Sequence, residues 1–329
     1  MSLPIPAGDI DVLAIGEVVI DMISQEPARH LREAETFRRY LGGSPTNIAV
    51  YVAKLGGRGA IIAKTGSGGF GQFIQAELQR YGVITDYLQM DPRVRTTIIF
   101  IARSTGTPDF EAFRDGDYRL QPEEVSEEAI ARARIVHAST FALSREPCRS
   151  AVRRALTLAQ AYGKLVSLDP NYSPLIWPNH EEARQVLAEF YRFATLTKPS
   201  LDDAHRLFGP DLSPTAYIAR FHAWGARLVV LTMGRNGALV SLDGHLLGHL
   251  PARSVAIADA TGAGDSFWAG FLTALLDGHA LARCAWFARE VAEIKLQTVG
   301  PLPHGIRRDQ VYARLPEEAT LWPWTDPSP

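Results

Sequence analysis

The stretch from Asp259 to Gly278, DATGAGDSFWAGFLTALLDG, joins a glycine-rich turn to an apolar segment. Small residues at 262–264 let the backbone approach a ligand closely, and Phe267, Phe271 and Ala274 recur at helical spacing. The first N–H groups of such a helix have no partner within it, and together with the positive end of the helix dipole they attract an anion such as a phosphate. The pattern therefore predicts a phosphate-binding turn at the start of a buried helix.

Asp265 lies in the first turn of this predicted helix. The helix dipole favours a carboxylate there, so we expect Asp265 to be ionised at neutral pH. A carboxylate beside a phosphate site is useful if it accepts a proton from a hydroxyl group that attacks the phosphate. The residues thus predict phosphoryl transfer to an alcohol, and the alternative is a helix that Thr261 caps and Asp265 merely stabilises.

The segment DATGAGDSF, residues 259–267, resembles the second signature of the ribokinase-like (PfkB) family of carbohydrate kinases, which usually reads DTTGAGDAF. The resemblance implies that Asp265 is the catalytic base and that Gly262, Ala263 and Gly264 form an anion hole with it. It also implies that Thr261 contacts the nucleotide.

Composition narrows the classes of partner. The chain has 329 residues, 46% hydrophobic and 21% charged, and a formal net charge of −2, so it has no basic face for nucleic acid and no polybasic membrane patch. No apolar run approaches the length of a membrane span, and the sequence shows no signal peptide. We expect a cytoplasmic protein that binds small molecules and keeps Cys148 and Cys284 as buried free thiols.

A second segment, YLGGSPTNIAVYVAKLGG over residues 40–57, pairs two glycines with a helix that has one apolar face. It resembles the first signature of the same family, which implies that Gly42, Gly43 and Asn47 approach sugar hydroxyls. An asparagine side chain can both donate and accept hydrogen bonds, which suits a polyol. The alternative is a plain turn before a helix.

Near the N-terminus, the continuous apolar run at 12–15 is typical of a strand buried in a parallel sheet. The resemblance places a substrate-binding aspartate after it, at Asp21. Taken alone, Asp21 is interpreted as a turn residue.

The segment GSGGFG, residues 66–71, satisfies GxGxxG between an apolar strand (60–63) and a helix (72–80), with Asp91 twenty residues further on. This spacing makes a dinucleotide site the main alternative of another class. The family has its own GxDxxG helix here, and Gly68 departs from its usual acid.

Residues 91–120 contain strand formers at 96–101 and turn residues at 104–109, which predict a hairpin. The family resemblance implies a small β lid over the sugar, formed by about 18–40 and 91–120. It also implies a substrate contact for Arg114, within FEAFRDGDY, whereas a lone arginine is more often solvated surface. Asp117 is left unassigned.

Strands and helices alternate between 123 and 207, with strands at 133–138, 165–169 and 196–198 and helices over 149–162 and from 181. Alternation of this kind predicts a parallel sheet covered by helices. Asp169, Pro170 and Asn171 follow one strand and resemble the family's substrate-binding DPN segment, which implicates Asp169 and Asn171; the arginine often found two residues later is Ser173 here.

KPSLDDAHRLFG, residues 198–209, resembles a family helix start, KPNxxE, that is tied to magnesium and phosphate. It implicates Lys198 and Ser200 in nucleotide binding and Asp203 in Mg²⁺ binding, with Ser200 and Asp203 replacing the usual asparagine and glutamate. Both replacements keep oxygen ligands. The alternative is an N-capped helix with an acidic first turn.

LVVLTMGRNG, residues 228–237, is a further buried strand that runs into a glycine turn. Its resemblance to the family's VTLGxxG implies that Thr232, Gly234 and Gly237 contact the nucleotide. The helix predicted over 283–297 resembles the one beside the adenine, and residues 316–329 are expected to form a surface tail.

We therefore expect one doubly wound α/β domain over 8–315, with a mostly parallel sheet flanked by helices and a small β lid. The resemblance implies an ATP-dependent, Mg²⁺-assisted sugar kinase, with activation by a monovalent cation such as K⁺ and dimerisation through the lid as further features of the family. The nearest members are fructokinases, 5-dehydro-2-deoxygluconate kinases and 2-keto-3-deoxygluconate kinases, so the acceptor is the primary hydroxyl of a small sugar or keto-sugar acid. A nucleoside kinase and a non-catalytic sugar-binding regulator remain the alternatives.

Overall fold

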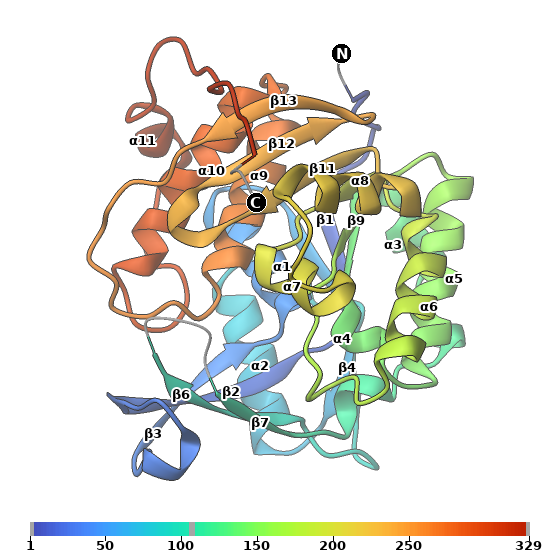
Figure 1. Ribbon diagram of the computed structural model, residues 1–329. Helices are drawn as coiled ribbons and strands as arrows, with labels where there is room; N and C mark the ends of the chain where they lie inside the picture. Colours follow the sequence, from blue (N-terminus) through green and yellow to red (C-terminus); the bar gives the residue numbers. More distant parts are fainter. Residues whose placement is uncertain (1–2, 105–108, 327–329) are drawn as a thin grey trace.

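The computed structural model describes residues 3–104 and 109–326. Its centre is a nine-stranded sheet in the order β13-β12-β11-β10-β9-β8-β1-β4-β5 (Figure 1). All neighbours from β5 to β11 pair in parallel, and β12 and β13 add an antiparallel edge. The strands are β1 (Ile10–Ile15), β4 (Gly59–Gly66), β5 (Leu88–Asp91), β8 (Ala133–Ser139), β9 (Leu165–Asp169), β10 (Leu196–Thr197), β11 (Leu228–Thr232), β12 (Ala238–Leu242) and β13 (His245–Leu250).

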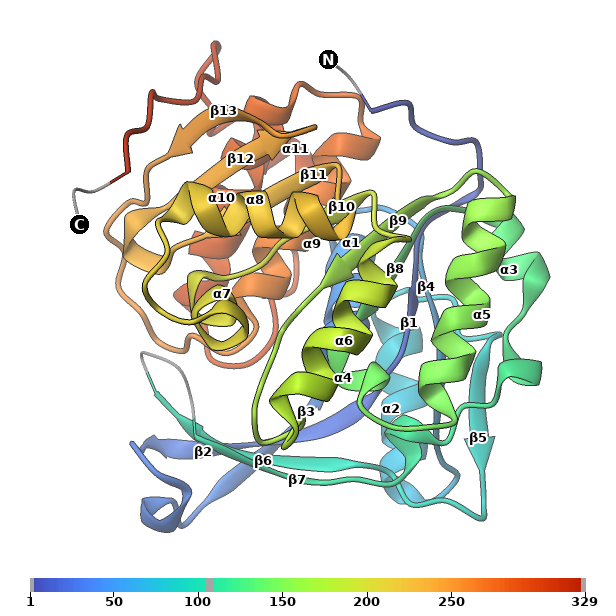
Figure 2. The same cartoon turned by 45° about the vertical axis from the view of Figure 1, so that its right-hand side comes forward.

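Helices cover both faces of this sheet, as Figure 2 shows. One face carries α1 (Ser44–Lys54), α2 (Gly69–Arg80), α9 (Ala263–Leu276), α10 (Leu281–Leu296) and α11 (Arg308–Tyr312). The other carries α3 (Glu127–Arg132), α4 (Thr140–Leu143), α5 (Cys148–Ala161), α6 (His180–Tyr191), α7 (Leu201–Phe208) and α8 (Pro214–Trp224). Successive residues of β1 point into opposite cores, since Val12 and Ala14 pack on the α9 side and Leu13 and Ile15 on the α5 side. The predicted doubly wound fold is confirmed.

A separate four-stranded sheet, the lid, has the order β3-β2-β6-β7 and lies along the lower rim of Figure 1. Its strands are β2 (Val19–Pro27), β3 (Phe37–Gly42), β6 (Ile98–Arg103) and β7 (Phe110–Phe113). The predicted hairpin is confirmed as the antiparallel pair β6 and β7, although most of its predicted turn lies outside the described residues. Short 3-10 turns occur at Leu31–Glu33, Gly116–Tyr118, Pro122–Glu124 and Gly234–Asn236.

The pairing register of the lid separates two faces. Asp21 lies opposite Ile99 and Tyr40, so these three side chains share one face, which we call the inner lid face. Met22 lies opposite Phe100, which places both on the outer lid face. The inner face contains a small apolar core of Val19, Ile23, Ile99 and Ile101.

The segment expected as a surface tail is tied to the sheet. Trp322 forms an antiparallel bridge with His249 of β13, and the side chain of Asp326 accepts hydrogen bonds from Thr215 at the start of α8. The boundary of the α/β domain at residue 315 stays a prediction. Both cysteines are free and buried, as expected, and no helix in the described part of the chain is long and apolar enough to span a membrane.

Candidate active site

The glycine turn and α9 meet as the sequence predicts. Gly262 is the N-cap residue of α9 and has φ 73°, a left-handed conformation that glycine adopts without strain. Asp265 is the third residue of the helix, and every residue from 266 to 276 is buried. The N–H groups of the first turn thus lie beside the Asp265 carboxylate, although that of Ala263 already donates to Ala260 O at 3.2 Å.

The first turn of α1 holds the half-buried Asp265. Ser44 Oγ donates to Asp265 Oδ1 at 2.8 Å, and Asn47 Nδ2 donates to Asp265 Oδ2 at 2.8 Å. Burial has the largest effect on this carboxyl and raises its pKa above the ordinary value, against the two hydrogen bonds, which lower it. Desolvation therefore makes Asp265 more basic than an ordinary carboxyl. That Asp265 is ionised at neutral pH stays a prediction.

Lys198 lies beside Gly264 of the glycine turn. Its buried ammonium group pairs with Asp169 Oδ2 at 3.0 Å, and a Cβ on Gly264 would come within 3.2 Å of its Nζ. Burial favours the neutral amine, but the carboxylates of Asp169, Asp203 and Asp265 outweigh it and raise the pKa of Lys198. A cation that stays charged beside the start of α9 adds to the attraction for a phosphate.

Asp21 points into the same region from the lid. It is only 8% exposed, and its oxygens accept no hydrogen bond from the described residues. Burial, with the charges of Asp265 and Asp259, raises its pKa to about 7. Gly42 leaves it room, because a Cβ there would lie 2.1 Å from Asp21 Oδ2, and Gly43 turns at φ 101° close to the Glu17 carbonyl. A buried acceptor without a partner is suited to a ligand hydroxyl.

The residues assigned to the nucleotide, apart from Thr261 in the glycine turn, gather where β10 and β11 end. Thr232 N donates to Pro199 O at 2.9 Å, and Ser200 and Thr232 form a bridge. Gly234 and Gly237 follow in a 3-10 turn with positive φ, and a Cβ on Gly237 would meet Leu250 O at 2.0 Å. Their location at the carboxyl ends of parallel strands is where α/β sheets bind ligands.

Asp203 has a structural role in this geometry. Its carboxylate accepts from Ser200 N at 3.0 Å and from Tyr172 N at 2.7 Å, and Ser200 Oγ caps α7 by accepting from Asp203 N. This is a capping box. No group of three or more His, Cys, Asp or Glu side chains within the described ranges could hold a metal ion. The metal role of Asp203 stays a prediction.

Asn171, and the residues Ser173 and Gly68 that differ from the family pattern, make contacts within their own turns. Asn171 adopts φ 36°, and its N–H donates to Asp169 Oδ1 at 3.1 Å. Ser173 Oγ accepts from Leu175 N in the next turn. Gly68 is the N-cap residue of α2 with open space around it. Gly71 packs its Cα against Gly66 O, so in this segment Gly71 is the glycine that a close backbone approach requires.

Arg114 is neither lone nor exposed. Its guanidinium group is 5% exposed and pairs with the fully buried Asp117. It also donates to Ser144 Oγ at 2.8 Å and to Phe141 O at 3.4 Å. The interpretation as solvated surface is wrong, and the missed partner is Asp117. The substrate contact implied for Arg114 stays a prediction. The guanidinium group that would make this contact is already paired with the Asp117 carboxylate.

Sequence reasoning also missed residues that support the site. Glu17, fully enclosed after β1, accepts from Ser139 Oγ and from Ser44 N, so it anchors the turn that presents Ser44 to Asp265. Tyr51 brings its hydroxyl to 3.2 Å from a Cβ placed on Gly262. An isolated acid directly after a buried strand was the available signal for Glu17, whereas nothing in the sequence separated Ser44 or Tyr51 from ordinary helix residues.

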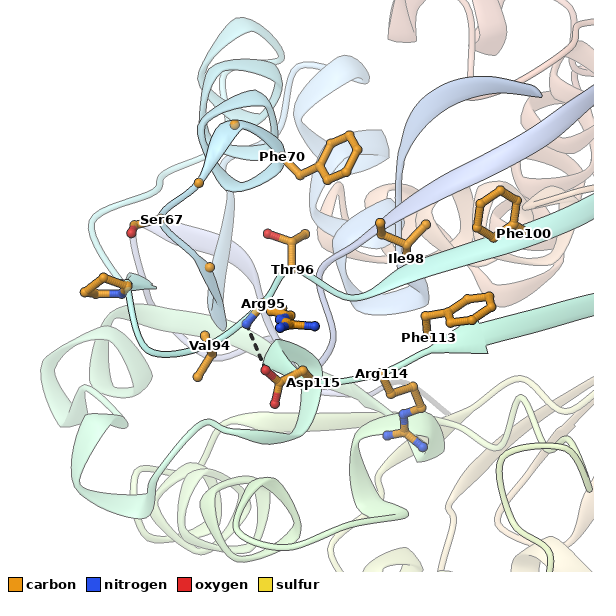
Figure 3. A pocket seen from close by; sticks show the side chains of 14 residues that line it. Ser67, Phe70, Val94, Arg95, Thr96, Ile98, Phe100, Phe113, Arg114 and Asp115 are labelled. Carbon is orange, nitrogen blue, oxygen red and sulfur yellow. Dashed lines mark hydrogen bonds between the residues drawn. The ribbon is translucent and has the colours of Figure 1, made fainter. Parts of the chain in front are cut away.

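A cavity of about 910 Å³ lies beside the lid, and Arg114 is among the residues that line it (Figure 3). Phe70 at the start of α2 and Ile98, Phe100 and Phe113 on the outer lid face line it. The cavity is therefore on the other side of the lid from Asp21.

Comparison with known proteins agrees with this architecture. The family model for pfkB family carbohydrate kinases matches residues 9–304. The ATP-dependent 6-phosphofructokinase of Thermoanaerobacterium thermosaccharolyticum is 35% identical over 89% of each chain.

Two solved fructokinases are similar as well. The Halothermothrix orenii enzyme has a TM-score of 0.75 and 38% identity, covering 86% of this chain and 96% of its own. The Vibrio cholerae enzyme, solved with fructose, ADP and a calcium ion, has a TM-score of 0.82 and 25% identity, covering 92% and 97%.

Proposed function

Because the chain belongs to the pfkB family of carbohydrate kinases, we propose that it transfers the γ-phosphate of ATP to a primary hydroxyl of fructose or a closely related keto-sugar, with Asp265 as general base. The observation that carries the proposal is the meeting of Asp265, the start of α9 and Lys198 at one point. A dinucleotide site at residues 66–71 is set aside, since the family accounts for that helix.

In the proposed reaction, the sugar hydroxyl gives its proton to Asp265, and its oxygen bonds to the γ-phosphorus while the bond to the β–γ bridging oxygen breaks and ADP leaves. Ser44 and Asn47 fix the carboxylate in place through both oxygens. The N–H groups of residues 262–265 and the Lys198 ammonium stabilise charge on the transferring group. Mg²⁺ would offset phosphate charge, and since Mg²⁺ keeps several waters, few protein oxygens such as those of Asp203 are needed to hold it.

On the substrate side, Asp21 is proposed to accept a hydrogen bond from a sugar hydroxyl, with Gly42, Gly43 and Asn171 lining the approach. Arg38 favours a second candidate acceptor, a sugar phosphate such as fructose 6-phosphate. It lies opposite Ile23 on the inner lid face, exposed, and forms no ion pair with a described residue. The name of the Thermoanaerobacterium relative points the same way.

The test is ADP release with MgATP on fructose, fructose 6-phosphate, 2-keto-3-deoxygluconate, 5-dehydro-2-deoxygluconate, ribose and adenosine. We expect turnover on a ketose, and Asp265→Asn should lose roughly 10²- to 10⁴-fold in kcat while it still binds ATP by calorimetry. Normal activity in Asp265→Asn would remove it from the mechanism. Sugar binding without turnover on every compound would instead favour a regulator, and preference for adenosine a nucleoside kinase.

We also propose that two copies pair through the outer lid face, in the cytoplasm. Phe37, Phe100 and Phe113 form a row of edge-to-face aromatic contacts there, and Phe113 is 56% exposed. Large apolar side chains gathered on a surface favour burial against a partner. Light scattering should give a dimer, and Phe113→Glu should shift it toward monomer, with Tyr162→Glu, an exposed aromatic elsewhere, as control. A monomer at micromolar concentration would contradict the pairing.

A further inference from the structure

Asp259, which opens the glycine turn, is a completely buried carboxylate. Its Oδ1 accepts from Thr261 N at 2.9 Å, which fixes the start of the turn. Its Oδ2 accepts from Gly300 N at 3.0 Å, in the loop after α10. A carboxylate with no contact with solvent requires a positive partner, because the cost of burying an unpaired charge is large.

The partner is Lys295, near the end of α10. Its Nζ lies 3.2 Å from Asp259 Oδ2 and 2.8 Å from Asp259 O, and both side chains are 0% exposed. Ala258 N donates to Leu296 O at 2.8 Å, so the two segments run side by side. The lysine thus binds a carboxylate oxygen and a carbonyl oxygen of one residue.

This arrangement can be compared with the monovalent cation expected from the family resemblance. A cation such as K⁺ needs a cage of oxygens and, in a dry interior, a counter-charge. Among the described residues beside the turn, Asp259 has the fully buried carboxylate that could supply it, and its Oδ2 already accepts from Gly300 N and pairs with Lys295. The residues present do not fit a K⁺ ion at this place.

We propose that the Lys295 ammonium replaces the monovalent cation, so that the phosphate-binding turn is held in its working shape without K⁺. Lys295 is a positioning residue: it neutralises Asp259, and Asp259 in turn holds Thr261 N and the loop at Gly300. The positive charge of Lys295 also acts on Asp265 at the other end of the turn. It lowers the pKa of Asp265, against the larger effect of burial, which raises it. The kcat and KM measurements that test this role rest on the kinase function proposed above.

The first experiment uses the unaltered protein. Steady-state kcat and KM for ATP are measured in KCl and in tetramethylammonium chloride at equal ionic strength, because tetramethylammonium is too large to enter a cation site. We expect the two sets of values to agree within error. A several-fold rise of kcat in K⁺ would overturn the proposal.

The second experiment uses Lys295→Ser, which removes the ammonium and leaves an oxygen and a space. In tetramethylammonium its kcat should fall roughly 10- to 100-fold through loss of geometry at the turn, and K⁺ should restore much of it. The control Lys164→Ser removes a half-buried lysine, remote from the turn, whose Nζ donates to Ala7 O, and it should behave as the unaltered protein. Full activity of Lys295→Ser in tetramethylammonium would contradict the assigned role.

A third measurement needs no substrate and therefore separates this proposal from the kinase function. The Tm of Lys295→Ser should rise with K⁺ concentration, as mass action requires for an ion that binds the folded state, and should not rise with tetramethylammonium. The unaltered protein should show no such difference between the two salts. If Lys295→Ser does not fold in either salt, the comparison on the unaltered protein decides the question.

Discussion

Asp21 and Gly42 show how one residue fixes the identity of another. The carboxylate of Asp21 occupies the space where any side chain at residue 42 would begin, so the glycine is required by its neighbour and not by its own backbone angles. The two are diagonal neighbours across β2 and β3, since the direct partner of Asp21 is Tyr40, two residues before Gly42. The shape of the proposed sugar site therefore depends on a single missing methyl group.

We expect Gly42→Ala to displace Asp21 and raise KM for the sugar by roughly 10-fold or more, since a misplacement of about 1 Å can cost up to about 10² in rate or affinity. The matched control is Gly68→Ala, because nothing lies within 4 Å of a Cβ at that position. KM and kcat for sugar and ATP give the comparison. Equal sugar KM values for the two variants would show that Asp21 is not a sugar contact.

At this scale the sequence predicted residue types better than residue partners. It placed Asp265, Lys198 and Asp169 in the site, but it could not predict that Lys198 pairs with Asp169 or that Asn47 donates to Asp265. Partners far apart in the chain meet only because strand order brings their ends together, and a pattern in a window of ten residues carries no such information. Lys295 was missed for the same reason.

At the scale of elements, α7 illustrates how one sequence pattern serves two explanations. An acidic first turn after a serine predicts both an N-cap and an oxygen ligand for a metal. The structure gives Asp203 three hydrogen-bonding partners, two from its own cap and one from Tyr172 N. Strand and helix positions were predictable because apolar periodicity is local, and β9 was predicted with its observed bounds. Whether Asp203 caps the helix or binds a metal depends on residues distant in the sequence, such as Tyr172, so it could not be predicted from the local pattern.

Asp203→Ala separates the two roles. As a cap with a further acceptor bond to Tyr172 N, its loss should lower the free energy of unfolding by about 1 to 3 kcal/mol. The apparent affinity for Mg²⁺ in the kinase assay should stay the same if capping is the whole role. Ser213→Ala, which removes the comparable cap of α8, is the control and should cost about 1 kcal/mol. A loss of Mg²⁺ affinity in Asp203→Ala alone would restore the metal assignment.

For the whole molecule, the buried acids at the junction of sheet, lid and α1 make stability depend on pH. Burial raises the pKa of Glu17 to about 8, against the hydrogen bonds that lower it. The unfolded chain releases this proton near pH 4.5, so between about pH 4.5 and pH 8 the folded state holds a proton that the unfolded state has lost. Stability must then fall as pH rises through that window.

Glu17→Gln removes this contribution. The free energy of unfolding of the unaltered protein should fall by up to about 1.4 kcal/mol per pH unit more steeply than that of the variant between about pH 5 and pH 8. Urea unfolding curves at each pH provide the measurement. Asp21, whose pKa is also raised, is present in both proteins and cancels in the comparison. Parallel pH profiles would mean that Glu17 titrates as an ordinary carboxyl.

The last residues of the chain bear on solubility. β13 is an edge strand of the large sheet, and Trp322 pairs with it. The ring of Trp324 packs at a tilt against His249, with the two ring centroids 4.7 Å apart. Edge strands with free backbone groups invite pairing with other chains, and natural proteins often cover them. A chain cut after 315 keeps the residues of the proposed active site, so it should retain turnover when dilute. On concentration it should aggregate through the uncovered edge, and an affinity tag is better placed at the N-terminus.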